Sequence, residues 1–147
     1  MSDTWLEKLS DEECLAHLRS EVVGRIAVIA DGLPVILPIN YRTVGGDHDA
    51  WLVVRTRPGN VIDRGSRHVA FEIDGIDYSR RQGWSVLVRG TLQHLTAEQV
   101  ARLELPDTDS WLSEERDAWL ALQPSAITGR RLQTLTLDWA FQARGYL

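Results

Sequence analysis

The chain has 147 residues, which predicts one domain, 1–147, long enough to bury a hydrophobic core. Its 44% hydrophobic and 25% charged residues are typical of a soluble globular protein, and its formal charge of −5 argues against a general nucleic-acid binder, whose surface would be basic. The only cysteine, Cys14, excludes an internal disulfide and a thiolate zinc cluster and fits a reducing cytoplasm.

The N-terminal segment and the longest apolar run both argue against export or membrane insertion. Residues 1–10 contain no basic region followed by an apolar one, which a secretory leader would require. The apolar run 26–39 is interrupted by Asp31, Gly32 and prolines, and it is too short to span a bilayer. The sequence therefore predicts a cytoplasmic protein without membrane attachment.

The first predicted elements are a helix and a β-hairpin. Ser10 and Glu13 have the spacing of a capping box, and the apolar stripe after them predicts a helix to about Ser20. The run IAVIA at 26–30 predicts a strand, and the dipeptide Asp31-Gly32 that follows is typical of a tight hairpin turn.

The next predicted strand, Leu33–Tyr41, carries the first half of a candidate site. Pro34 and Pro38 lack the backbone N–H, so this strand is not expected to be paired on both sides along its whole length. Backbone groups near 39–41 would then be open to a flat polar heterocycle.

The strand after it, Ala50–Thr56, ends in the second half of the candidate site. Arg55 and Thr56 close this strand, and Pro58-Gly59-Asn60 opens a short helix at 60–65. A cation, a hydroxyl and a helix N-terminus so close together predict a phosphate seat.

The second half of the chain continues the β pattern and then inserts helices. Alternation of apolar and polar side chains predicts strands with one buried face, and capping residues mark the helices. The predicted elements are strands at 68–74 and 83–95, a helix capped by Thr96 and Gln99, a helix at about 113–122, a connection with Pro124 and Gly129, and a last strand at 134–142.

The element order predicts a mainly β fold. Six strands and three or four short helices, without alternating βαβ units, favour an antiparallel β-barrel with helices packed outside. A GxGxxG loop and a Walker loop are both absent from the sequence, so nucleotide binding by those routes is not expected.

The ionisable residues show no catalytic or metal-binding pattern. Glu72 and Asp74 share a strand face, which a solvated surface explains better than paired acid–base catalysis. No nucleophile–base arrangement is visible, so no catalytic residue is assigned, and in an enzyme of this sequence a cofactor would supply the chemistry. The histidines lack metal-ligand spacing and are expected at surface or hydrogen-bonded positions; they are His17, His48, His68 and His94.

Five short motifs occur in an order and spacing that resemble a known family. The chain resembles the pyridoxamine 5′-phosphate oxidase-like flavin-binding split-barrel family, and within it the small actinobacterial proteins related to nitroimidazole-resistance proteins. The match runs from Gly24 to Leu95. The motifs are GRIAV at 24–28, PINY at 38–41, RTRPG at 55–59, VAFEID at 69–74 and GWSVLVRG at 83–90.

The resemblance implies a six-stranded antiparallel split barrel that forms a homodimer and binds FMN at the subunit interface. The residues that the family pattern assigns to the cofactor are Pro38, Ile39, Asn40 and Tyr41 along the isoalloxazine ring, Arg55, Thr56, Gly59 and Asn60 at the ribityl chain and phosphate, and Trp84 and Ser85 on the flavin of the partner subunit.

Asn60 departs from the family pattern, because many relatives have a lysine directly after the glycine equivalent to Gly59. The loss of this charge predicts weaker phosphate binding and leaves open a deazaflavin. The predicted function is an FMN-dependent oxidoreductase acting on a small molecule. The alternatives are a flavin, deazaflavin or haem carrier without turnover, and a barrel that only dimerises. From the residues alone, a solvated Arg55 and a core-packed Trp84 are the commoner explanations.

Overall fold

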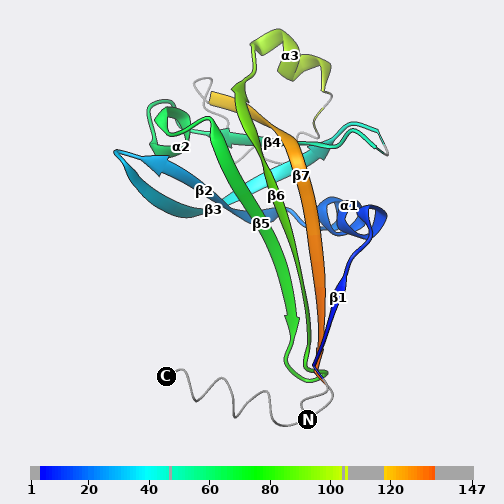
Figure 1. Cartoon of the computed structure of the whole chain (residues 1–147). Coiled ribbons are helices and arrows are strands. Elements are labelled where there is room, and N and C mark those ends of the chain that lie inside the picture. The colour runs from blue at the N-terminus through cyan, green and yellow to red at the C-terminus, as the bar shows by residue number, and fades with distance from the viewer. Residues whose placement is uncertain (1–3, 47, 104, 106–117, 135–147) are drawn as a thin grey trace.

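The computed structural model describes residues 4–46, 48–103, 105 and 118–134, whose strands form one antiparallel sheet that closes on itself (Figure 1). Helices α1 (Asp11–Ser20), α2 (Val61–Arg64) and α3 (Ala97–Arg102) follow the first, fourth and sixth strands. The strands are β1 (Thr4–Lys8), β2 (Val23–Ala30), β3 (Leu33–Val44), β4 (Trp51–Thr56), β5 (His68–Asp77), β6 (Gln82–His94) and β7 (Ala118–Thr134).

The predicted antiparallel barrel is confirmed, although the described residues form seven strands where six were expected. The sheet order is β1-β7-β4-β3-β2-β5-β6, and pairing of β6 with β7 closes the ring. The ring therefore uses β2 to β7, while β1 pairs only with β7, with Thr4 opposite Thr134. The strand β1 was not expected from the sequence.

The prediction for the C-terminal region was wrong, because β7 occupies much of it. Residues 118–122, expected at the end of a helix, form a strand that pairs with β4 on one side and with β6 on the other. The barrel thus gives this run two ladders of hydrogen bonds, and these tertiary contacts override its local helical pattern. Residues 113–117 and 135–142, expected in a helix and in the last strand, lie outside the described residues.

Pro124 and Gly129 lie inside β7 and not in a connection as predicted. Pro124 pairs with Gly90 next to a bulge, where Ser125 of β7 is the extra residue between Pro124 and Ala126. A proline is tolerated at such a bulge because the ladder is already interrupted. Gly129 lies against α1, where an added Cβ would come within 2.6 Å of the Cys14 sulfur and 2.8 Å of Leu9. Glycine here permits close packing of the helix on the strand.

The predicted capping boxes and the predicted hairpin turn are confirmed. The side chain of Ser10 caps α1 and that of Thr96 caps α3, each as part of a capping box. The β2–β3 hairpin turns at Asp31 and Gly32, whose φ angles of 52° and 78° are those that a tight hairpin turn requires.

The core lies inside the ring and under α1. The inward faces of the strands provide buried aliphatic and aromatic side chains such as Ile26, Phe71 and Val88, and α1 adds Cys14 and Leu18. Cys14 is a buried, free cysteine within this core. Among the described residues, no helix has the length and apolar character needed to cross a membrane.

The strands β5, β6 and β7 continue beyond the ring as a long arm, along which β1 lies at the end away from α2 (Figure 1). At the base of the arm, Trp84 stacks on His17 of α1, with ring centroids 3.8 Å apart and planes 17° apart. Arg131 of β7 bonds the carboxylates of Glu7 and Glu13, which ties β1 and α1 to the arm.

Candidate functional site

The candidate site lies where β3 and β4 separate. Their ladder joins Tyr41–Val44 to Trp51–Val54 and ends there. Beyond it, among the described strands, β3 is paired only with β2, and the end of β4 is paired only with β7. Asn40 and Arg55 are the first positions beyond this shared ladder. We call the region between these two residues the β3–β4 fork.

The prolines of β3 explain why the ladder ends at the fork. Tyr41 donates its N–H to the Val22 carbonyl at 2.9 Å, so by strand parity the odd positions of β3 bond β2. Pro34 and Pro38 have the other parity and turn their N–H-free nitrogens toward the opposite edge. The prediction that β3 is not paired on both sides along its whole length is confirmed.

The predicted residues Pro38 to Tyr41 divide between the two faces of β3. Ile39 and Tyr41 point into the core, whereas Pro38 and Asn40 are exposed. A ligand at the fork would therefore meet the outward side chains and the backbone.

Tyr41 is engaged in the core and not at the fork. It is 1% exposed and donates its hydroxyl to the Leu18 carbonyl at 2.6 Å, at the end of α1. Its ring meets Phe71 edge-on, with centroids 4.8 Å apart. Burial raises the pKa of the Tyr41 hydroxyl, so this group stays protonated near neutral pH.

Arg55 places a half-buried cation on the β4 side of the fork. Its guanidinium carbon lies over the ring of Trp119, 5.4 Å from the ring centroid, and Trp119 is its partner in the β4–β7 ladder. The attraction between a cation and an aromatic face helps to fix the direction of this side chain. A fixed cation beside an unpaired strand edge is suited to an anionic group on a flat ligand.

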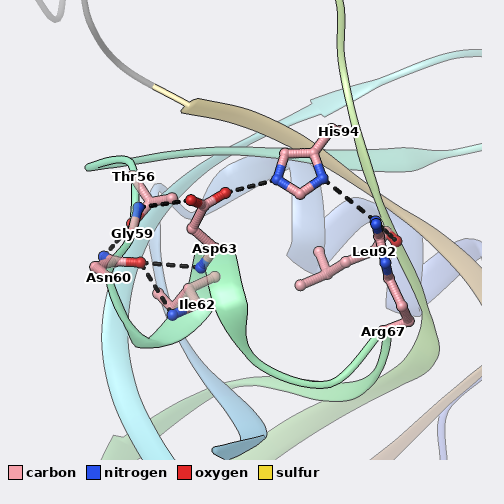
Figure 2. Close-up of polar contacts among 8 residues, drawn as sticks. All are labelled: Thr56, Gly59, Asn60, Ile62, Asp63, Arg67, Leu92 and His94. Carbon is pink, nitrogen blue, oxygen red and sulfur yellow. Dashed lines mark hydrogen bonds and ion pairs between the residues drawn. The ribbon is translucent and has the colours of Figure 1, made fainter.

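The loop that follows, residues 56–63, satisfies its own polar groups (Figure 2). We call it the α2 loop. The Asn60 side chain bonds the Thr56 hydroxyl and accepts the N–H groups of Ile62 and Asp63 at 3.0 Å each. The N-terminus of α2, predicted as part of a phosphate seat, is thus capped by Asn60.

Asp63 joins the α2 loop to the end of β6 (Figure 2). One carboxylate oxygen accepts the Gly59 N–H at 2.6 Å, and the other lies 2.6 Å from Nε2 of His94. The Gly59 N–H and the His94 contact lower the pKa of Asp63. On the far side of the imidazole, Arg67 lies 3.3 Å from Nδ1 of His94.

The sequence interpretation did not identify Asp63, His94 or Arg67 as parts of the site. One local signal was present, since Asn60 and Asp63 have the N-cap and third-position spacing of a capping pair. No local signal points to His94, which is 31 positions away from Asp63. Its predicted hydrogen-bonded surface position agrees with the structure.

Within one chain, Trp84 and Ser85 lie far from the other predicted site residues. They lie at the arm end of β6, whereas the α2 loop meets β6 at His94, roughly 30 Å further along the strand at 3.3 Å per residue. Trp84 is half-buried against His17, in keeping with a packing role. A single site that includes both groups of residues would need a second copy of the chain.

The outer face of the sheet carries a charged cluster. Arg25 lies 3.0 Å from Glu72 and 2.5 Å from Asp74, on adjacent strands. Burial and the neighbouring Asp74 raise the pKa of Glu72. The predicted solvated acidic face is therefore an ion-pair cluster centred on Arg25.

Apolar side chains surround this cluster. A shallow groove of about 430 Å³ crosses the outer surface of β2, β5 and β6, with Ala27, Ala70 and Arg89 among its lining residues. Large apolar side chains remain exposed on this face; they are Val23, Ile29, Ile36 and Leu87.

Three comparisons relate this fold to known proteins. The family model described as pyridoxamine 5′-phosphate oxidase matches residues 10–131. The chain is 33% identical over 133 residues to an uncharacterized protein of Mycobacterium tuberculosis, Rv0080, covering 85% of this chain and 84% of that protein. It is 32% identical to an FAD-binding protein of Mycobacterium smegmatis, covering 86% and 98% of the two chains, with a TM-score of 0.71.

A more distant similarity extends over much of the chain. The FAD- and haem-binding protein of Mycobacterium smegmatis is 19% identical, covers 92% and 79% of the two chains and has a TM-score of 0.65, which shows a common fold. The family model spans most of the chain and includes all five sequence motifs. The chain therefore belongs to the pyridoxamine 5′-phosphate oxidase-like split-barrel family.

Proposed function

We propose that this protein is a flavin-dependent oxidoreductase acting on a small molecule, with FMN as its cofactor. The observation that carries the proposal is the β3–β4 fork, where the unpaired edge of β3 and Arg55 of β4 lie at the same end of the shared ladder. Family membership and the FAD-binding neighbour with 32% identity support a flavin as the ligand.

The residues at the fork fit parts of such a cofactor. The outward side chains and backbone of Pro38 and Asn40 would lie along a flat ring, and Arg55 would pair with a phosphate. A bound flavin supplies hydride exchange at its N5, while the protein binds and orients it. No catalytic side chain is assigned, because the Tyr41 hydroxyl is committed to the Leu18 carbonyl.

The proposal includes a homodimer with the cofactor between subunits. Two observations support it. Trp84 and Ser85 lie far along β6 from the α2 loop, so only a second copy would bring them to the same ligand. The exposed apolar side chains of the outer sheet face, such as Ile36 at 67% exposure, would be covered by an isologous interface.

A flavin carrier without turnover is the second candidate. The burial of Tyr41 favours it, since Pro38 to Tyr41 then offer no ionisable group to a substrate. The two candidates differ in electron transfer: an oxidoreductase should be reduced by a nicotinamide donor or a reduced deazaflavin in stopped-flow experiments, and a carrier should not.

The first test is the identity of the ligand. We expect the purified protein to show flavin absorbance, and mass spectrometry of the released molecule to give FMN. Titration of apoprotein with riboflavin, FMN, FAD and a deazaflavin would rank the ligands. A colourless protein that binds none of them would refute the proposal, and a monomer in sedimentation equilibrium at micromolar concentration would refute the two-chain site.

A further inference from the structure

At the α2 loop, the phosphate of a flavin would compete with a side chain of the protein for a hydrogen-bond donor. The Gly59 N–H would be a natural donor to a phosphate oxygen, but in this structure it donates to the Asp63 carboxylate at 2.6 Å (Figure 2). The carboxylate holds this donor in the way that an anionic ligand would. It also places a negative charge beside the predicted phosphate position.

The carboxylate of Asp63 is held from both oxygens. His94 lies 2.6 Å from the second oxygen, and the Asp63 N–H is itself bonded to Asn60. The Asp63 side chain is only 18% exposed. These contacts fix the carboxylate against Gly59, so a phosphate cannot take the Gly59 N–H unless this arrangement opens.

The Asp63 carboxylate is ionised near neutral pH, because the Gly59 N–H, His94 and Arg67 all lower its pKa. Arg67 can only donate, so Nδ1 of His94 accepts from it and the proton of a neutral imidazole sits on Nε2, facing Asp63. The Nε2–H group donates to the Asp63 carboxylate, which stays negatively charged beside Gly59. The nearest basic residue on α2, Arg64, lies 3.9 Å from Asp31 instead.

We propose that Asp63 is a specificity-determining residue that occupies the Gly59 N–H and weakens the contribution of the phosphate to flavin binding. His94 is a positioning residue, because it holds the carboxylate in place. The inference rests on the proposed flavin site and adds a prediction about its selectivity. Together with Asn60 in place of lysine, Asp63 gives this chain a less favourable phosphate seat than the family pattern implies.

The test is Asp63→Asn, which removes the charge but keeps an oxygen for the Gly59 N–H. We expect FMN to bind about tenfold more tightly at low salt, which is the repulsion expected between a carboxylate and a phosphate dianion about 6 Å apart at the dielectric constant of water. The gain should shrink at high salt. Riboflavin, which has no phosphate, should bind as before.

Asp77→Asn is the matched control. Asp77 also accepts backbone N–H groups, from Ser79 and Arg80 at 3.0 and 3.1 Å, but it lies at the tip of the arm. It removes the same charge away from the Gly59 N–H, so it should not change FMN affinity relative to riboflavin affinity. If Asp63→Asn leaves FMN affinity unchanged, or weakens FMN and riboflavin equally, Asp63 only holds the loop and the inference is wrong.

A second measurement separates this inference from the proposed function. Inorganic phosphate would be titrated into the wild type and into Asp63→Asn while the Gly59 amide resonance is followed by NMR. A shift that is larger in the variant supports the inference even if the wild type binds no flavin, an outcome that would refute only the proposed function. A Gly59 resonance that moves in neither protein would overturn the inference.

Discussion

The two sides of the β3–β4 fork differ in how their backbone groups are satisfied. Along β3, prolines leave an edge that no described strand pairs with, and the outward side chains are exposed. In the α2 loop, Asn60 and Asp63 already hold the N–H groups of Gly59, Ile62 and Asp63 itself. If a flavin binds at the fork as proposed, its ring would contact the open β3 side directly. Its phosphate could bind on the loop side only by displacing hydrogen bonds that the loop makes within itself.

Among the changes described below, replacement of Arg55 should have the largest effect on FMN affinity. Arg55→Ala removes a charge-assisted hydrogen bond worth roughly 1.5–3 kcal/mol, so FMN should bind about ten- to a hundredfold more weakly. Riboflavin should be nearly indifferent. Fluorescence titrations of both ligands would measure this. Arg80→Ala at the tip of the arm is the control, and it should not change FMN affinity relative to riboflavin affinity. Equal weakening of both ligands would show that Arg55 acts through the stability of the fold.

Tyr41→Phe tests whether the inward face of β3 is purely structural. Loss of the buried hydroxyl should lower the free energy of unfolding by roughly 0.5–1.5 kcal/mol, since Thr43 still donates to the Leu18 carbonyl and leaves it paired. Urea denaturation would give this value. Flavin affinity should be unchanged, and a clear loss of affinity would mean that the tyrosine reaches the ligand.

Asn60→Lys restores the residue type of many relatives on the loop side. The apoprotein should lose about 1 kcal/mol, because the side chain that caps α2 is gone. FMN should nevertheless bind more tightly, and the gain should fall as salt screens the new ion pair over about 8–10 Å. Parallel thermal melts and flavin titrations at low and high salt would decide it. No gain at low salt would place the phosphate away from Asn60.

Lowering the pH should reduce the stability of the α2 loop, with a smaller effect than the substitutions above. The Gly59 and His94 contacts lower the pKa of Asp63 in the folded state, so the unfolded chain takes up this proton first as pH falls. The stabilisation of the folded state by these two contacts is present above the ordinary aspartate pKa of about 4 and is lost as the pH falls below it. The carboxyl resonance of Asp63 would report this titration by NMR. In His94→Ala its midpoint should rise, and an unchanged midpoint would contradict the His94 contribution.

Much of the fold could be predicted because its signals are local. The capping boxes at Ser10 and Thr96 and the turn at Asp31-Gly32 depend on residues within a few positions of each other. The strand at 118–122 was missed because its structure depends on pairing with β4 and β6, which no short window contains. The seventh strand, β1, likewise depends on a partner near the other end of the sequence.

The candidate site, too, could be predicted only where its residues are close together in the sequence. Arg55 and Asn60 are found from a contiguous motif, and the structure places them on one side of the fork. The bond between Asp63 and His94 joins residues on different elements, and its competition for the Gly59 N–H requires atomic positions. Proposed sharing of Trp84 and Ser85 between subunits came from family resemblance and stays a prediction.

The long strand β7 has a consequence for how the chain folds. It supplies the partner for β1, β4 and β6, and its last residue, Thr134, pairs with Thr4. The barrel therefore cannot close during synthesis until nearly the whole described sequence has left the ribosome, and contacts of such long sequence separation fold slowly. Until then the edges of β4 and β6 stay unpaired, and these edges are where a nascent chain would aggregate or pair with another copy.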